Sequence, residues 1–149
     1  MPVALTHGAP ISSLAVLSDG RLASGGPDGK IKLWPKEGTG EPVVLAHGAG
    51  VWSLAVLGDG RLASGGIDGT IKLWLQEGTG EPVVLPHGGG VLSLAVLADG
   101  RLASGGQNGT IKLWPKEGTG EPVVLAHGDP VWSLAVLADG RLASGGAEI

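Results

Sequence analysis

The chain has 149 residues, including 29 glycines and no cysteine, and its formal net charge is −4. The acidic balance argues against a nucleic-acid-binding protein, and the lack of cysteine excludes disulfides and thiolate metal sites. No stretch approaches the ~18 apolar residues of a membrane helix, and the start MPVALTHG does not resemble a signal peptide, so we expect a cytoplasmic protein without membrane association.

A 40-residue unit is written almost four times along the chain. Repeats 1 to 3 span residues 2–41, 42–81 and 82–121, and repeat 4, residues 122–149, is incomplete. Repeats 2 and 3 differ at only eight positions, which indicates recent amplification or deliberate design. Such periodicity is typical of repeat architectures, so we expect one domain, or half-domain, over residues 1–149.

Each repeat contains four short apolar segments that are too short for helices. In repeat 2 they are Val43–Ala46, Val51–Leu57, Arg61–Ser64 and Thr70–Trp74. Apolar runs of four to seven residues between glycine-rich segments are typical of β-strands. We therefore expect each repeat to fold as an antiparallel meander.

The segments between these strands contain specific turn residues. Asp59-Gly60 and Asp68-Gly69 predict type I′ hairpin turns, in which both central residues have positive φ. Pro42 precedes the first strand of repeat 2, and a proline is tolerated only at an edge or a strand start, so this strand should be outermost.

The segment Val51–Leu57 is apolar on both faces, which indicates a strand covered on both sides. Four strands in about 40 residues, with such an inner strand, predict an all-β fold, a β-propeller of four-stranded antiparallel blades.

The ordered motifs resemble those of the WD-repeat β-propeller family over the whole chain. In repeat 2 they are Leu45-Ala46-His47, Val51-x-Ser53-Leu54-Ala55-Val56, Asp59-Gly60, Leu62-Ala63-Ser64-Gly65, Asp68-Gly69 and Ile71-Lys72-Leu73-Trp74. The chain departs from the family where Leu75 replaces the aspartate after the tryptophan and where Ala46 replaces the glycine before the histidine.

The resemblance implies a structural tetrad of His, Ser, Asp and Trp in each repeat, in which His bridges Ser and Asp, and Ser reaches the indole N–H. In repeat 3 an asparagine replaces the aspartate, and repeat 4 ends before its tryptophan, with Glu148 at the acidic position. The residues are His7, Ser24, Asp28 and Trp34; His47, Ser64, Asp68 and Trp74; His87, Ser104, Asn108 and Trp114; and His127 and Ser144.

Catalytic, metal-binding and phosphate-binding interpretations of these residues have less support than the structural one. A Ser-His-Asp hydrolase triad would not recur in every repeat, and no G-x-S-x-G motif is present. The four histidines would lie in separate blades, too far apart for a metal. The runs EGTGEP and SGGxDGT lack the G-K-[ST] of a phosphate loop and are expected to be loops. We therefore expect no catalytic residue, metal or cofactor, and a solvated lysine at positions 32, 72 and 112.

The positions that vary between repeats suggest a binding surface. The resemblance implies that they share the top face of the propeller, near its channel, where partners of this family bind. Exposed tryptophans there would suit a binding hot spot, although drift after duplication or packing between blades would also explain the variation. The residues are Ser12, Trp52, Leu92, Trp132, Ile67, Gln107 and Asp129.

Fewer than four complete blades do not normally close a ring. We expect a homodimer that closes an eight-bladed ring, with Val3–Thr6 as the strand that completes the last blade; a strained four-bladed monomer is the alternative. The function that follows is a non-enzymatic, self-assembling scaffold, with a protein- or peptide-binding module as the alternative.

Overall fold

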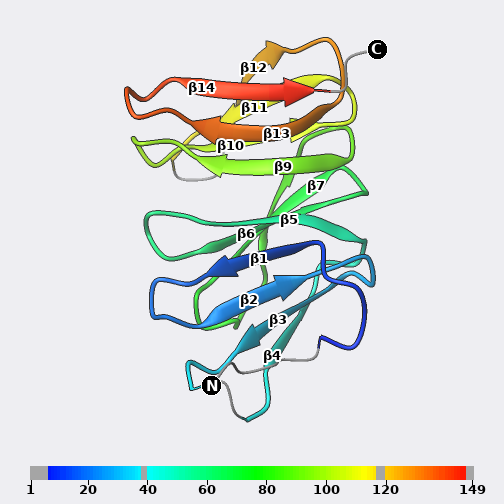
Figure 1. Ribbon diagram of the computed structural model, residues 1–149, viewed down its shortest axis with the longest axis vertical. Helices are drawn as coiled ribbons and strands as arrows, with labels where there is room; N and C mark the ends of the chain where they lie inside the picture. Colours follow the sequence, from blue (N-terminus) through cyan, green and yellow to red (C-terminus); the bar gives the residue numbers. More distant parts are fainter. Residues whose placement is uncertain (1–6, 38–39, 117–119, 147–149) are drawn as a thin grey trace.

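The computed structural model describes residues 7–37, 40–116 and 120–146, which form fourteen strands and no helix. Four antiparallel sheets stack along the long axis, from the sheet of β1 at one end to that of β14 at the other (Figure 1). This confirms the all-β propeller fold with four-stranded blades. Within the described residues, no helix is long and apolar enough to cross a membrane.

The sheets are called blades 1 to 4 here. Blade 1 contains β1 (Ser13–Val16), β2 (Leu22–Gly25), β3 (Lys30–Trp34) and β4 (Val43–Ala46); blade 2 contains β5 (Val51–Val56), β6 (Leu62–Gly66), β7 (Thr70–Trp74) and β8 (Val83–Pro86). Blade 3 contains β9 (Val91–Val96), β10 (Leu102–Gly106), β11 (Thr110–Trp114) and β12 (Val123–Ala126), and blade 4 contains β13 (Val131–Val136) and β14 (Leu142–Gly146).

Each four-stranded blade takes its outer strand from the following repeat. The strand order is β1-β2-β3-β4, and β4 pairs with β3 in the register Lys30↔Ala46 to Leu33↔Val43. The prediction that a single repeat forms a meander was therefore wrong, because its first strand belongs to the preceding blade. The outermost position of that strand is confirmed, and the missing N–H of Pro42 falls just before an edge strand. The segment Val3–Thr6 lies outside the described residues.

The aspartate-glycine turns are not of type I′. Gly60 and Gly69 have φ of 94° and 85°, whereas no non-glycine residue among those described has a positive φ. Gly60 donates its N–H to the Leu57 carbonyl, and the Asp59 carboxylate accepts the Arg61 N–H at 3.1 Å. The aspartate therefore stabilises the turn through its side chain, and only the glycine adopts the left-handed conformation.

The second strands of repeats 2 and 3 extend past the predicted end because two glycines lie within each strand rather than in a loop, whereas β2 of repeat 1 contains only Gly25. A Cβ on Gly66 would lie 2.3 Å from Nε2 of His47, and a Cβ on Gly65 would lie 2.5 Å from Cγ1 of Val91. These glycines therefore permit close approach of a histidine and of the next blade.

Among the described residues, the hydrophobic core consists of three clusters, each between two successive blades. The inner strands β1, β5, β9 and β13 contact one another in order along the stack. Between blades 1 and 2, Ala23 and Ile31 of blade 1 pack with Val51 of blade 2, and all three are fully buried. Each blade is thus stabilised mainly by its neighbours.

Candidate functional site

A buried polar network links the loop that follows each outer strand to the next blade. In repeat 2, Trp74 donates its indole N–H to Oγ of Ser64 at 2.9 Å, and that oxygen lies 2.8 Å from Nδ1 of His47. His47 Nε2 lies 3.1 Å from Oγ1 of Thr70, which donates to the Asp68 carboxylate at 2.8 Å. His47 follows β4 of blade 1, so the network links blades 1 and 2.

Thr70 is the residue that the sequence analysis missed. The predicted direct bridge from histidine to aspartate is replaced by a path through the Thr70 hydroxyl. The closest Asp68 oxygen lies 3.5 Å from His47 Nε2. A threonine at the start of the third strand in repeats 2 and 3, two residues after the aspartate or asparagine of the turn, was the available signal.

The buried network favours a neutral histidine. It is satisfied when the proton is on Nε2: Ser64 then donates to Nδ1, and Nε2–H donates to Thr70. Burial lowers the pKa of His47, and the Asp68 carboxylate offsets only part of that effect. Burial alone would raise the pKa of Asp68, but the hydrogen bonds from Thr70 outweigh it and hold the pKa below its usual value.

The other repeats modify the network at single positions. In repeat 1, Lys30 replaces the threonine, and His7 Nε2 lies 3.4 Å from the Asp28 carboxylate. In repeat 3, Asn108 accepts the Thr110 hydroxyl at 2.7 Å, and burial lowers the pKa of His87.

The corresponding contacts of the remaining tetrad residues follow the same pattern. Trp34 and Trp114 donate to Ser24 and Ser104 at 3.0 and 2.9 Å. In repeat 4, His127 and Ser144 keep their 2.8 Å contact, but Ser144 is exposed. Glu148 lies outside the described residues.

The lysines of the third strands are not simply solvated, contrary to prediction. Lys72 is half-buried and donates to the His47 carbonyl at 2.6 Å, and Lys32 donates to the His7 carbonyl at the same distance. The ammonium group of Lys32 also lies 5.9 Å from the centre of the Trp34 ring. Lys32 and Lys72 therefore stabilise the loops that contain the histidines by binding their backbone carbonyls.

The serines of the network are poorly placed for nucleophilic chemistry. Ser64 is fully buried, and its oxygen is occupied by the indole of Trp74 and the ring of His47. No substrate can reach such an oxygen without disrupting the blade. Among the described residues, no group of three or more His, Asp or Glu side chains could hold a metal ion. The arrangement positions blades rather than reacting atoms.

The variable positions that we predicted to bind a partner gather on one edge of the stack, which we call the top face. It consists of the loops before the inner strands and the turns between the second and third strands. Ile67 N–H donates to the Gly50 carbonyl at 2.9 Å, and Gln107 N–H donates to the Gly90 carbonyl at 2.8 Å, which joins loop and turn. Ser12, Ile67, Gln107, Asp129 and Trp132 are exposed, whereas Trp52 and Leu92 are half-buried.

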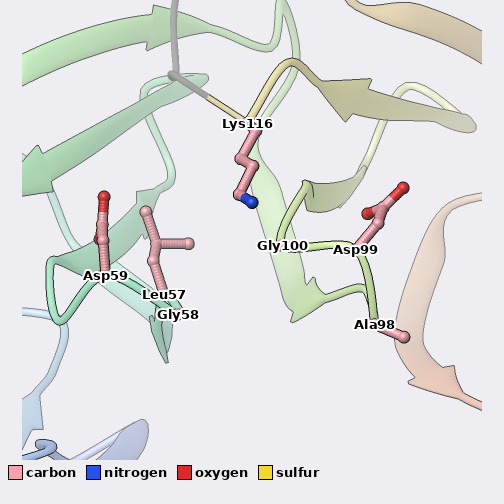
Figure 2. A pocket seen from close by; sticks show the side chains of 7 residues that line it. All are labelled: Leu57, Gly58, Asp59, Ala98, Asp99, Gly100 and Lys116. Atoms are coloured by element: carbon pink, nitrogen blue, oxygen red, sulfur yellow. The ribbon is translucent and has the colours of Figure 1, made fainter.

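A hollow of about 400 Å³ lies on the opposite edge, between the first turns of blades 2 and 3. Figure 2 shows Lys116 extending between the turns of Asp59 and Asp99. Both carboxylates already pair with arginines of their own turns, Arg61 and Arg101, at 2.9 and 2.8 Å. The hollow is lined by Leu57, Gly58, Asp59, Ala98, Asp99, Gly100 and Lys116.

The hollow follows from two substitutions between repeats rather than from a set of converging ligand groups. Between blades 1 and 2 the same space holds a hydrogen bond from Ser18 Oγ to Gln76 Oε1 at 3.3 Å. Between blades 2 and 3, Gly58 replaces the serine and Lys116 replaces the glutamine, so the space stays open.

Stacked four-stranded blades, each fastened by a buried histidine–serine–tryptophan network, define a β-propeller built from tandem repeats. The family profile described as "WD40: WD domain, G-beta repeat" matches residues 2–35, 40–74 and 80–115, which lie in the first three repeats. The chain therefore belongs to the WD40 repeat family, whose propellers are typically non-enzymatic scaffolds and protein-binding modules.

Among solved structures, the chain is similar to the WD40 β-propeller domain of Doa1. The sequence identity is 27% and the TM-score is 0.83, and the match covers 95% of this chain and 49% of that one. The chain thus spans about half the length of this relative. No curated protein sequence matches it.

Proposed function

We propose that the chain is a non-enzymatic scaffold that self-assembles, with two copies closing one eight-bladed ring. The observation that carries this proposal is the exposure of apolar side chains at the ends of the stack. Leu14 of blade 1 is 58% exposed, whereas Leu54, its equivalent in blade 2, is 7% exposed. At the other end, Leu137 of blade 4 is 40% exposed, against 6% for Leu57.

Both end surfaces are apolar. Ile11, Leu14 and Val16 are exposed on blade 1, and Ala135, Leu137 and Ala143 are exposed on blade 4. Removing such groups from water stabilises association by roughly 25 cal/mol per Å² before the costs of binding. The described stack holds three four-stranded blades and two strands of a fourth, and it matches about half of a WD40 propeller domain, so two copies would supply the blades of one ring.

Light scattering after gel filtration, over a concentration series, tests this proposal. A chain of 14.8 kDa that forms a two-copy ring should show a mass near 30 kDa that falls only on strong dilution. A mass near 15 kDa at every concentration would exclude the two-copy ring, as would a mass that grows continuously, which indicates an open filament.

The top face favours a second function, the binding of a protein or peptide. Trp132 is 58% exposed beside the exposed Asp129, and Ile67 and Gln107 occupy the same edge. Exposed aromatic side chains are enriched among residues that dominate binding energy. The exposure of Trp132 is partly an end effect, since Trp52, its equivalent in an inner blade, is half-buried.

Peptides selected from a displayed library on the immobilised protein would test the top face. The variants W52A and W132A should lose binding to the selected peptides while the protein stays folded. Leu75 is exposed near the opposite edge and provides the matched control L75A. Equal loss with L75A, or unchanged binding with both tryptophan variants, would exclude the top face as the site.

A further inference from the structure

The inner blade interfaces share one steric contact. Each strand glycine of one blade faces the first branched residue of the next: Gly25 faces Val51, Gly65 faces Val91, and Gly105 faces Val131. A Cβ built on these glycines would lie 2.9, 2.5 and 2.5 Å from the valine Cγ1, respectively. All three valines are fully buried. The glycine therefore forms a hole that the next blade fills with a β-branched side chain.

The same interfaces share one polar contact. The backbone N–H of Leu54 donates to Oγ of Ser13 at 3.1 Å, and Leu94 donates to Ser53 at 3.2 Å. Leu134 donates to Ser93 at 3.1 Å. Each donor lies 41 residues after its acceptor, so an inner-strand serine satisfies an amide of the next blade.

The end surfaces carry the two unmatched halves of this interface. At Gly145 of blade 4, a built Cβ would meet nothing within 4 Å. Ile11 occupies the valine position in repeat 1 and is 46% exposed. Ser133 and Leu14 occupy the serine and leucine positions, and Leu14 lies in the first blade of the described chain, with no blade before it.

We propose that blade 4 of one chain docks on blade 1 of a second copy in the same register as the inner blades. Ile11 of one copy then fills the hole at Gly145 of the other, and Ser133 Oγ accepts the Leu14 N–H. We call this interface between blade 4 of one copy and blade 1 of the other the seam. It rests on the proposed self-assembly and specifies which residues meet. A second copy is the occupant because the two end surfaces carry the two halves of the glycine–valine contact and of the serine–amide contact that join the inner blades.

The seam is heterologous, because different surfaces of the two copies meet. Such contacts form closed rings when the rotation per subunit divides the circle, and open filaments otherwise. Two identical seams close a ring of two chains. Ile11 is branched at Cβ like the valines of the inner interfaces, so it presents the same branch point to the glycine hole.

A cysteine pair tests the seam, and the chain has no cysteine of its own. In the inner interfaces the built glycine Cβ lies 3.3, 3.0 and 2.9 Å from the valine Cβ. A disulfide needs a Cβ–Cβ distance of about 3.8 Å. Because the two end surfaces belong to separate chains, a small shift between the chains gives this distance. The double variant I11C/G145C should form a covalent two-chain species under mild oxidation. The control I11C/G58C should not, since Gly58 lies at the opposite-edge turn of blade 2.

The outcomes distinguish failure of the proposed seam from failure of the proposed self-assembly. A two-chain mass with no more crosslinking by I11C/G145C than by the control would overturn the seam while self-assembly stands. A covalently closed single chain would overturn both, because it would show that one stack closes on itself. A one-chain mass without crosslinking would also overturn both.

A larger side chain at Gly145 tests the glycine hole without a crosslink. Gly145→Val should reduce two-chain association at least tenfold, because the new side chain occupies the space that Ile11 needs. The fold of the single G145V chain should be unchanged, since nothing lies within 4 Å of the new Cβ. Gly58 also has nothing within 4 Å and provides the matched variant G58V, which should associate normally. Normal association of G145V would overturn the seam.

Discussion

Blades 2 and 4 carry almost the same sequence in their first two strands and differ in burial. Val131–Val136 repeats Val51–Val56 residue for residue, and Leu142–Gly146 repeats Leu62–Gly66. Ala63 and Ser64 are fully buried in blade 2, whereas Ala143 and Ser144 are exposed in blade 4. Identical local sequence thus produces core in one place and surface in the other.

The difference shows that the stability of this fold resides between blades rather than within them. Blade 2 has a neighbour on each face, and blade 4 is preceded by blade 3 but followed by no blade in the described chain (Figure 1). This is the behaviour of repeat arrays, in which stability is a sum of unit and interface contributions. Matched substitutions at equivalent positions can therefore separate the two contributions.

The largest expected effect is at the inner leucine. Leu54→Ala removes a buried side chain between blades 1 and 2 and should lower the free energy of unfolding by about 2–5 kcal/mol. Leu14→Ala, its equivalent on the exposed end, should lower it by less than about 0.5 kcal/mol in the single chain but weaken two-chain association. Urea unfolding of the two variants at low concentration measures the difference, and equal losses would contradict the comparison.

The next effect is at the strand glycine. Gly65→Ala places a methyl group 2.5 Å from a methyl of Val91, which is stiff and fully buried, and should cost about 1–3 kcal/mol. Gly145→Ala should leave the stability of the single chain unchanged within about 0.5 kcal/mol. Thermal unfolding measured side by side tests this, and a stable G65A would show that the blades can move apart at no cost.

The polar network gives a smaller difference. Ser64→Ala leaves the indole N–H of Trp74 and Nδ1 of His47 without their shared partner, and buried groups left in this way cost about 1–3 kcal/mol. Ser144→Ala removes the same hydroxyl where water can replace it, so we expect a change below about 0.5 kcal/mol. Denaturant midpoints report both, and a large effect of S144A would mean that blade 4 is as closed as blade 2.

The smallest expected effect is a loss of stability in mild acid. The pKa values of His47 and His87 are lowered by burial, so below about pH 6.5 the unfolded chain binds protons that the folded chain does not. Stability is complete above that pH and falls as the pH decreases, by less than about 1 kcal/mol per histidine at pH 6. Asp68, whose pKa is lowered, titrates outside this range. Constant stability from pH 7.5 to pH 6 would contradict a neutral buried histidine.

The sequence predicted the propeller because the repeat fixes strand length, order and turn positions. Thr70–Trp74 and the position of the Asp59-Gly60 turn were predicted correctly because both depend on local chemistry, whereas the type of that turn was predicted wrongly. The assignment of β4 to blade 1 was missed because strand pairing between repeats depends on tertiary contacts.

The buried network was only partly visible in the sequence. His47, Ser64 and Trp74 were expected together, but the Thr70 bridge depends on a 3.1 Å contact that spacing does not specify. The serines between blades, such as Ser13, were overlooked because a small polar residue in an apolar strand has no local signature. Its partner Leu54 lies 41 residues further on, in the next blade.

The match between the two end surfaces is tested most directly by amide hydrogen exchange at four equivalent leucines, measured by NMR at low and high protein concentration. The N–H groups of Leu54, Leu94 and Leu134 donate to serines of the preceding blade and should be protected at both concentrations. The N–H of Leu14 should exchange quickly in the single chain and become protected as the two-chain species forms. Rapid exchange at Leu14 in a sample of two-chain mass would contradict the claim that the end surfaces complete the interface of the inner blades.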